Sequence, residues 1–353
     1  MREIIITAND AGRRLDRFLR KYLPGASLGE VYKIIRKDVK VDSRRRPESY
    51  MLNEGEVLTL YLSDEDLGRF GAAEAAQAGG GPHARSAVGK DRARAKRNFS
   101  IVYEDDNILI ASKPFGLLTH GDSREKKDHL ANQVKDYLIA SGSFDPRNEK
   151  VFAPAPVNRL DRNTTGIVLF GKTASSMREL NRMIRCDDIS KFYLTIACGA
   201  IEEDLYLSGS LVKDEAANKV TILSKDTALA DARSIETIAR PLEALHFGSG
   251  LTATLCEVEL VTGRSHQIRA HLASVGHPLI GDSKYAKKSA FRINEYVRKN
   301  CSLTTQLLHA GRIEFLNSVA EYDSLSYLAG KTFECPVPKR FAGILESLRH
   351  DGH

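Results

Sequence analysis

The sequence predicts an α+β protein in which a small basic domain precedes a large domain built on a mixed, largely antiparallel sheet. Three observations support this prediction: the composition changes twice along the chain, an Ala- and Gly-rich segment separates the two parts, and β-rich runs outnumber helical patterns in the second part. The expected division is a first domain over residues 1–63, a linker over 64–98 and a second domain over 99–353. A chain of 353 residues is long enough for this arrangement.

The first 63 residues are compact and basic, with 13 Lys and Arg against nine Asp and Glu. Apolar residues at helical spacing predict one helix over RLDRFLRKYL and a second over LGEVYKIIRK. Short strands are expected in VKVDSRRRPESYMLNEGEVLTLYL. The basic side chains of the helices and of residues 44–46 can form one positive face, although a solvated charged surface is the simpler alternative.

The segment GAAEAAQAGGGPHARSAVGKDRARAKRN, residues 71–98, is rich in Ala and Gly and basic towards its end. Such a composition buries too little apolar surface to order itself. We therefore expect a flexible basic linker within residues 64–98.

The large domain opens with SIVYEDDNILIASKP, in which two β-rich runs flank a turn and predict a hairpin. Further strands are expected at IVLFG, KFYLTIACG and LTATLCEVELV, and helices at ASSMRELNRMIR and SHQIRAHLASVG. The last helix has Ser265 as its expected N-cap and Gly276 just past its end.

Several classes of protein are disfavoured by composition and motifs. The net charge of +6 and the pI near 8.9 favour a polyanionic partner. The five cysteines are scattered without a CxxC pair, which is typical of a reducing compartment, and no apolar run has the length of a signal peptide or membrane span. We therefore expect a cytoplasmic protein with no membrane contact. No nucleotide-binding or serine-hydrolase motif is present, and a metal site built from His266, His277, His309 and Asp282 is not favoured.

Polar chemistry is concentrated in segments of the large domain where a fold alone would not require it: VNRLDRNTTG, KFYLTIACG, VTGRSHQIRAHLASVGHPLIGD and LLHAGRIEF. Arg269 falls inside a short helix whose Ile268 and Leu272 are expected to face the core. A half-buried arginine needs a carboxylate, and Asp161 is the candidate partner. The alternative is that Asp161 forms an ordinary surface ion pair with a neighbouring arginine, Arg159 or Arg162.

The first domain resembles the small αL-motif RNA-binding domain in its RLDRFL, IIRKDVKVD and LNEGEVLTLYL segments. This resemblance implies contacts to RNA phosphates and RNA shape. The candidate RNA-binding residues here are Arg13, Arg17, Arg36 and Lys37.

The second domain resembles the RluA-type pseudouridine synthases through RLDxxTxG, TGRxHQIRxHL, GHPxxGD and LHA, which occur in that order. The resemblance implies an isomerase that converts specific uridines of RNA to pseudouridine without a cofactor, after the target base is flipped out. With the αL-motif domain it implies large-subunit ribosomal RNA as substrate, and we expect a monomer. Two alternatives remain open: a synthase acting on transfer RNA, and a non-catalytic RNA-binding factor of ribosome assembly.

The family's catalytic residues map onto Asp161 as nucleophile, Arg269 as the arginine paired with it, and Tyr193 as the tyrosine that packs on the flipped base and assists proton removal at C5. Arg159 maps to the arginine that holds the extruded nucleotide or the gap it leaves. Arg264 and His266 complete the expected substrate-binding set, although His266 and His309 are also explained as hydrogen-bonded structural histidines.

Overall fold

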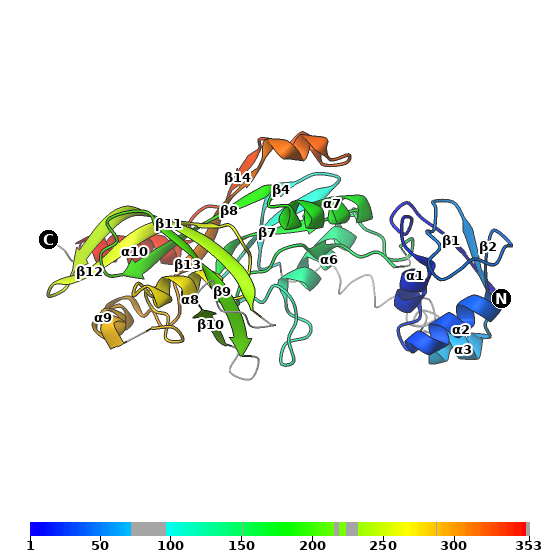
Figure 1. Ribbon diagram of the computed structural model, residues 1–353, viewed down its shortest axis with the longest axis horizontal. Helices are drawn as coiled ribbons and strands as arrows, with labels where there is room; N and C mark the ends of the chain where they lie inside the picture. Colours follow the sequence, from blue (N-terminus) through cyan, green and yellow to red (C-terminus); the bar gives the residue numbers. More distant parts are fainter. Residues whose placement is uncertain (72–96, 150, 215–218, 224–231, 287, 351–353) are drawn as a thin grey trace.

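The computed structural model describes residues 1–71, 97–149, 151–214, 219–223, 232–286 and 288–350. Its strands form two separate sheets, one of three strands and one of eleven (Figure 1). The part of the chain it describes contains no helix long and apolar enough to cross a membrane.

The N-terminal part, drawn in blue in Figure 1, is a three-stranded antiparallel sheet of order β1-β3-β2 packed against helices. Its elements are β1 (Arg2–Ile5), α1 (Leu15–Tyr22), α2 (Leu28–Asp38), β2 (Val39–Val41), β3 (Val57–Leu60) and α3 (Asp64–Arg69). Both predicted helices are present. Helix α2 begins at a capping box in which Ser27 and Glu30 bond to each other's backbone N–H groups, and the apolar face of α1 places Phe18 and Leu19 in the core.

Helix α3 lies where the sequence predicted the start of the linker. Ser63 caps its first turn, and Leu67 and Phe70 are buried in the same apolar cluster as α1 and α2. These two apolar side chains make residues 64–71 part of the N-terminal unit, so the predicted boundary at residue 63 is too early in the structure. Residues 72–96 of the predicted linker lie outside the described residues.

The large sheet has the strand order β10-β9-β11-β12-β8-β13-β7-β5-β4, with β14 added to β13 and β6 added to β7. Its strands are β4 (Ser100–Glu104), β5 (Ile108–Lys113), β6 (Ala155–Pro156), β7 (Thr165–Gly171), β8 (Ile189–Cys198), β9 (Leu205–Asp214), β10 (Lys219–Leu223), β11 (Arg233–Phe247), β12 (Leu251–Leu260), β13 (Leu308–Phe315) and β14 (Thr332–Glu334). The pairing of β13 with β7 is parallel and the other described pairings are antiparallel, which confirms the predicted mixed sheet.

Helices cover this sheet and close its ends (Figure 1). They are α6 (Leu130–Ala140), α7 (Ala174–Arg185), α8 (Gln267–Ser274), α9 (Phe291–Cys301) and α10 (Lys339–His350), with short 3-10 turns η2 (Lys288–Ala290), η3 (Asn317–Glu321) and η4 (Ser326–Leu328). The predicted β4–β5 hairpin, the strands β7, β8 and β12, and the helices α7 and α8 are all present.

Strands β9 to β11 were not predicted. The longest of them, β11, contains Pro241 next to a register shift between Pro241 and Glu243 in its pairing with β12. Within sheets, proline is normally found on edge strands or at bulges. Pro241, which interrupts the strand pattern in the sequence, accordingly lies at the irregular point of β11.

The parallel contact between β7 and β13 depends on a glycine. Gly166 has φ +113°, and a Cβ at this position would lie 2.1 Å from the carbonyl oxygen of Ala310. Gly281 likewise has φ +74°. The close approach at Gly166 brings the loop before β7, which carries Asp161, into the centre of the sheet.

Candidate active site

A pocket of about 190 Å³ opens beside the loop that precedes β7. Its walls come from that loop, from β8 and from the start of α8. The residues expected to form the site that line it are Arg159, Asp161, Tyr193, Arg264, His266 and Arg269. Segments separated by more than a hundred residues in the sequence therefore meet here.

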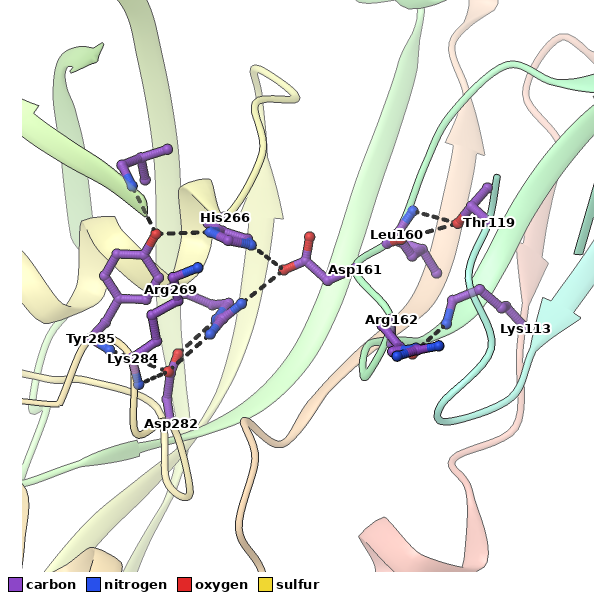
Figure 2. A network of polar contacts seen from close by, with 11 residues as sticks. Lys113, Thr119, Leu160, Asp161, Arg162, His266, Arg269, Asp282, Lys284 and Tyr285 are labelled. Atoms are coloured by element: carbon purple, nitrogen blue, oxygen red, sulfur yellow. Dashed lines mark hydrogen bonds and ion pairs between the residues drawn. The ribbon is translucent and has the colours of Figure 1, made fainter. Parts of the chain in front are cut away.

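Asp161 and Arg269 form the ion pair that the sequence predicted. Arg269 Nη1 donates to Asp161 Oδ2 at 3.1 Å, and the Arg269 side chain is only 8% exposed (Figure 2). Ile268 and Leu272, on either side of it in α8, are buried in the main core cluster as expected. The Asp161 side chain is 25% exposed, so it reaches the pocket while its arginine stays in the protein interior.

The second partner of Arg269 is Asp282, which the sequence analysis considered only as a disfavoured metal ligand. Arg269 donates to it through Nε at 2.7 Å and Nη2 at 3.0 Å, and Asp282 is 1% exposed. Burial alone would lower the pKa of Arg269, but the two carboxylates raise it. The signal available in the sequence was the GHPxxGD motif, whose final residue is Asp282.

The backbone on both sides of Asp161 is held by the chain segment that follows β5. Thr119 Oγ1 donates to the Leu160 carbonyl at 3.0 Å and accepts from the Leu160 N–H at 3.1 Å. Lys113 Nζ and the Gly116 N–H both donate to the Arg162 carbonyl at 3.0 Å (Figure 2). Asp161 thus lies between two anchored peptide units.

Lys113 was not expected to belong to the site. It is fully buried, and Nζ also donates to the carbonyls of Pro114 at 3.1 Å and Leu117 at 2.7 Å. Burial lowers its pKa to about 7, although the charge of Asp161 acts in the opposite direction. The available sequence signal was a lysine at the end of the apolar run ILIASKP, where a solvated side chain would otherwise be expected.

His266 starts α8 instead of Ser265, which was wrongly expected to be the N-cap. His266 is the N-cap residue, with φ +56° and ψ +13°, and it makes no side-chain capping bond. Its ring points instead towards Asp161, with Nε2 3.7 Å from Oδ2, and its Nδ1 lies 2.8 Å from the hydroxyl of Tyr285 (Figure 2). Tyr285 is a further residue of the site that the sequence analysis missed.

Strand β8 places Tyr193 and Lys191 in the pocket wall, two residues apart and therefore on one face of the strand. Tyr193 is 7% exposed, and burial together with the Asp161 charge raises its pKa well above the usual range. Lys191, which was not predicted, is 9% exposed, and burial lowers its pKa. The charge of Asp187 acts against this lowering of the Lys191 pKa.

Arg159 and Arg264 are exposed at the edge of the pocket. The Arg162 side chain is also exposed. The contact of Arg162 with Lys113 is made by its backbone carbonyl, which accepts from Lys113 Nζ. His309 is buried, with Nδ1 2.9 Å from Thr165 Oγ1 and Nε2 3.1 Å from the Cys335 carbonyl, as expected for a structural histidine. Within the described ranges, no three His, Cys, Asp or Glu side chains are arranged to hold a metal ion.

The basic residues expected to bind RNA in the N-terminal domain do not join this pocket. Arg13 and Arg17 line a groove of about 770 Å³ between α1 and α7, to which α7 contributes Arg178. Burial lowers the pKa of Arg13, and Arg178 adds to this effect. Arg36 and Lys37 are exposed in the last turn of α2.

Comparison with known proteins finds a matching family and similar proteins. Residues 107–274 match the family described as RNA pseudouridylate synthase, and this stretch includes Asp161, Tyr193 and Arg269. Ribosomal large subunit pseudouridine synthase C of Escherichia coli (strain K12) is 29% identical over 316 residues, covering 88% of each chain. The protein of the same name from Vibrio cholerae is 29% identical over 320 residues, covering 90% of each chain.

A solved structure, human RNA pseudouridylate synthase domain containing 4, matches 71% of this chain and 93% of its own with a TM-score of 0.49 and 21% identity. The family match lies in the large domain, and the similarity to the two bacterial proteins extends over most of the chain. The chain is therefore similar to RNA pseudouridylate synthases through its large domain, and to the ribosomal large subunit pseudouridine synthases C over most of its length.

Proposed function

We propose that this pseudouridine synthase modifies large-subunit ribosomal RNA and uses Asp161 as its nucleophile. The observation that carries the catalytic assignment is a carboxylate, partly exposed to a pocket, whose Oδ2 is bound by an arginine that a second, buried carboxylate holds in place. This arrangement holds the carboxylate in a fixed position at the pocket, as a nucleophile requires.

The reaction is an isomerisation. The bond between uracil N1 and ribose C1′ breaks, the base turns, C5 forms the new bond to C1′, and the hydrogen lost from C5 is balanced by protonation of N1. Asp161 takes part by attacking either the sugar or the base, and in both cases the carboxylate is released at the end. The pocket admits a single base, so the nucleotide has to leave its stack, at a cost of a few kcal/mol.

Tyr193 supplies a flat apolar surface in the pocket wall beside Asp161. Because its pKa is raised, the side chain is a neutral phenol at pH 7, suited to packing on the base and to hydrogen bonding. Removal of the C5 proton by Tyr193 would need its phenolate form, which burial and the Asp161 charge disfavour.

The cations of the pocket fit the phosphates that flank the target nucleotide. Arg159 and Arg264 lie at its edge, and the largely buried Lys191 lines its wall. Burying an ammonium is costly, and an RNA phosphate would add a counter-charge.

The substrate assignment rests on the relatives. Both bacterial proteins carry names that specify the large ribosomal subunit, and the chain aligns with them over 88–90% of their length. The basic groove beside α1 supports a second contact with RNA, made by Arg13 and Arg17 and, further along α2, by Arg36 and Lys37. We also expect a cytoplasmic protein, in keeping with a ribosomal RNA substrate, and a monomer, since the proposed site is built from one chain.

The test of the function is an Asp161→Asn variant. Pseudouridine is mapped chemically across total RNA from cells that contain the wild-type protein, the variant or neither. We expect one or more ribosomal positions to depend on the wild-type protein and to be lost in the variant, with RNA affinity within about twofold of wild type. Modified positions confined to transfer RNA would overturn the substrate assignment. Normal modification by Asp161→Asn would overturn the role of Asp161, and no dependent position in any RNA would favour the non-catalytic alternative.

The contribution of the N-terminal domain is tested by an Arg13→Gln/Arg17→Gln variant. Each lost phosphate contact is expected to reduce the slope of log Kd against log salt by about 0.7–0.9. The chemical step, measured with RNA in excess, should stay at the wild-type rate. An unchanged salt slope would exclude these two residues from the RNA interface.

A further inference from the structure

The two donors that face Asp161 approach the same oxygen. Arg269 Nη1 lies 3.1 Å from Oδ2, and His266 Nε2 lies 3.7 Å from the same atom. Figure 2 shows the other carboxylate oxygen, Oδ1, pointing away from both groups. The two oxygens of Asp161 are therefore not equivalent: Oδ2 faces two protein donors, and Oδ1 faces neither of them.

His266 occupies its position at a cost in backbone conformation. It has φ +56°, the left-handed region that non-glycine residues rarely adopt, and its side chain is 11% exposed. Such conformations persist where the surrounding structure enforces them, and they cluster at functional sites. Here the conformation turns the imidazole away from the helix N–H groups that an N-cap normally serves and towards Asp161 and Tyr285.

The hydrogen bonds of Tyr285 determine where the proton of His266 lies. The Val220 N–H donates to the Tyr285 oxygen at 3.0 Å, so the hydroxyl hydrogen is free to be donated. The acceptor at 2.8 Å is His266 Nδ1. Nδ1 is thus an acceptor, and the single proton of the neutral ring belongs on Nε2, the atom that faces Asp161.

The neutral form of the ring agrees with its surroundings. Burial lowers the pKa of His266; the charges of Arg269 and Lys284 act in the same direction, and those of Asp161 and Asp282 oppose them. The result is a neutral imidazole at pH 7 that presents an N–H to the carboxylate.

We propose that His266 and Tyr285 form a positioning pair for the proposed nucleophile: Tyr285 keeps the proton of His266 on Nε2, and His266 joins Arg269 in holding Oδ2, so that Oδ1 is the oxygen that reacts. The pair rests on the proposed role of Asp161. The present separation of 3.7 Å exceeds a hydrogen bond, and such contacts commonly tighten when substrate fills the site.

The experiment compares four proteins: wild type, Tyr285→Phe, His266→Asn and the double variant. Phenylalanine keeps the ring that packs 5.1 Å from the Arg269 guanidinium and removes only the hydroxyl, and asparagine tolerates the left-handed backbone while being too short to contact both partners. The substrate is a large-subunit ribosomal RNA transcript labelled with tritium at uridine C5, which loses that hydrogen in the reaction. Single-turnover tritium release gives the chemical step, and filter binding gives RNA affinity.

Each single variant is expected to slow the chemical step roughly tenfold to a hundredfold, with RNA affinity and unfolding temperature close to wild type. Because Tyr285 acts through His266, the double variant should be no slower than His266→Asn alone. Losses that multiply in the double variant would overturn the pair, as would a wild-type rate in Tyr285→Phe.

A spectroscopic measurement tests the pair without relying on turnover. The ¹⁵N shifts of His266 should report the Nε2–H form in wild type and a mixture of both tautomers in Tyr285→Phe. The same tautomer in both proteins would overturn the role of Tyr285 even if the variant were slow. A wild-type protein that releases no tritium from this RNA would overturn the proposed function and the pair with it, whereas normal release by wild type and Tyr285→Phe overturns the pair alone.

Discussion

Asp282 binds Arg269 along one edge of its guanidinium, at 2.7 and 3.0 Å, and leaves Nη1 for Asp161. The buried carboxylate thus determines the direction in which the arginine presents its remaining donor. A lysine has no such planar set of donors and cannot bind both carboxylates in this geometry.

Substituting Arg269 should therefore separate stability from catalysis. Arg269→Met leaves Asp282 as an unpaired buried charge, and we expect it to lower the free energy of unfolding by about 3–5 kcal/mol. Arg269→Met/Asp282→Asn removes that charge and should regain much of the stability, while the chemical step stays at least roughly a hundredfold below wild type. Urea unfolding and single-turnover tritium release measure the two effects. Activity that returned together with stability would show that Arg269 has only a structural role.

Lys113 is expected to act on catalysis through the backbone beside Asp161. Lys113→Met leaves three carbonyls, those of Pro114, Leu117 and Arg162, without this donor, and the free energy of unfolding should fall by about 1–3 kcal/mol. The chemical step should also slow roughly tenfold or more because the Asp161 loop loses an anchor.

The matched control for this prediction is Lys172→Met. Lys172, like Lys113, has a largely buried side chain, and its Nζ lies 2.8 Å from Glu104 Oε1. Unlike Lys113, it has no contact with the loop that carries Asp161, and it does not line the pocket. The Lys172→Met variant should be less stable than wild type and keep the wild-type single-turnover rate. Equal kinetic losses in the two variants would remove the case for a specific effect of Lys113.

Lys191 should contribute to substrate binding rather than to the chemical step. With Lys191→Met we expect a higher KM, an unchanged kcat, and a slope of log KM against log salt that is smaller by about 0.7–0.9, the effect of one phosphate contact. Lys299→Met serves as control because Lys299 is exposed on α9 and pairs with Glu295. A salt slope that did not differ between the two variants would count against a phosphate near Lys191.

His271 should make stability fall in mild acid. It is 2% exposed, with Nδ1 3.0 Å from Thr237 Oγ1, and burial lowers its pKa to about 4. An unfolded histidine has a pKa of about 6.5, so between pH 6.5 and 4 the unfolded chain binds more protons than the folded one. The contribution of His271 is therefore complete above pH 6.5 and declines by up to about 1.4 kcal/mol per pH unit as the pH falls through this window.

Urea unfolding of wild type and His271→Gln between pH 4.5 and 7.5 measures this contribution. The variant should show the shallower dependence on pH, because glutamine does not titrate. His246→Gln, at an exposed position, should keep the wild-type dependence. Parallel curves for wild type and His271→Gln would contradict the prediction.

The parts of the site that local chemistry dictates could be predicted from the sequence. Arg269 had to find a carboxylate because its helix turns it towards the interior, and the pairing with Asp161 follows from that need. The strands β7 and β8 and the helix α8 were likewise recognisable from their apolar spacing.

The remainder depends on contacts that no local pattern encodes. The left-handed backbone of His266 and the hydroxyl of Tyr285 become relevant only after the two segments have met, and Ser265 fits the usual capping rule better than the residue that starts the helix. Lys113 looks like an ordinary strand-end lysine until the Asp161 loop covers it. Helix α3 contains too few apolar residues to be recognised within the surrounding segment, although Leu67 and Phe70 complete the core of the first domain.

The attachment of residues 160 and 162 to the segment after β5 also has a consequence for how the enzyme acquires activity. Thr119 and Lys113 reach these peptide units only when β5 and β7 are paired in register, because both segments continue directly from those strands. Arg269 and Asp282 arrive from the other half of the sheet, more than a hundred residues later in the chain. The site therefore has no local precursor: a newly made chain has its catalytic geometry only when both halves of the sheet have assembled.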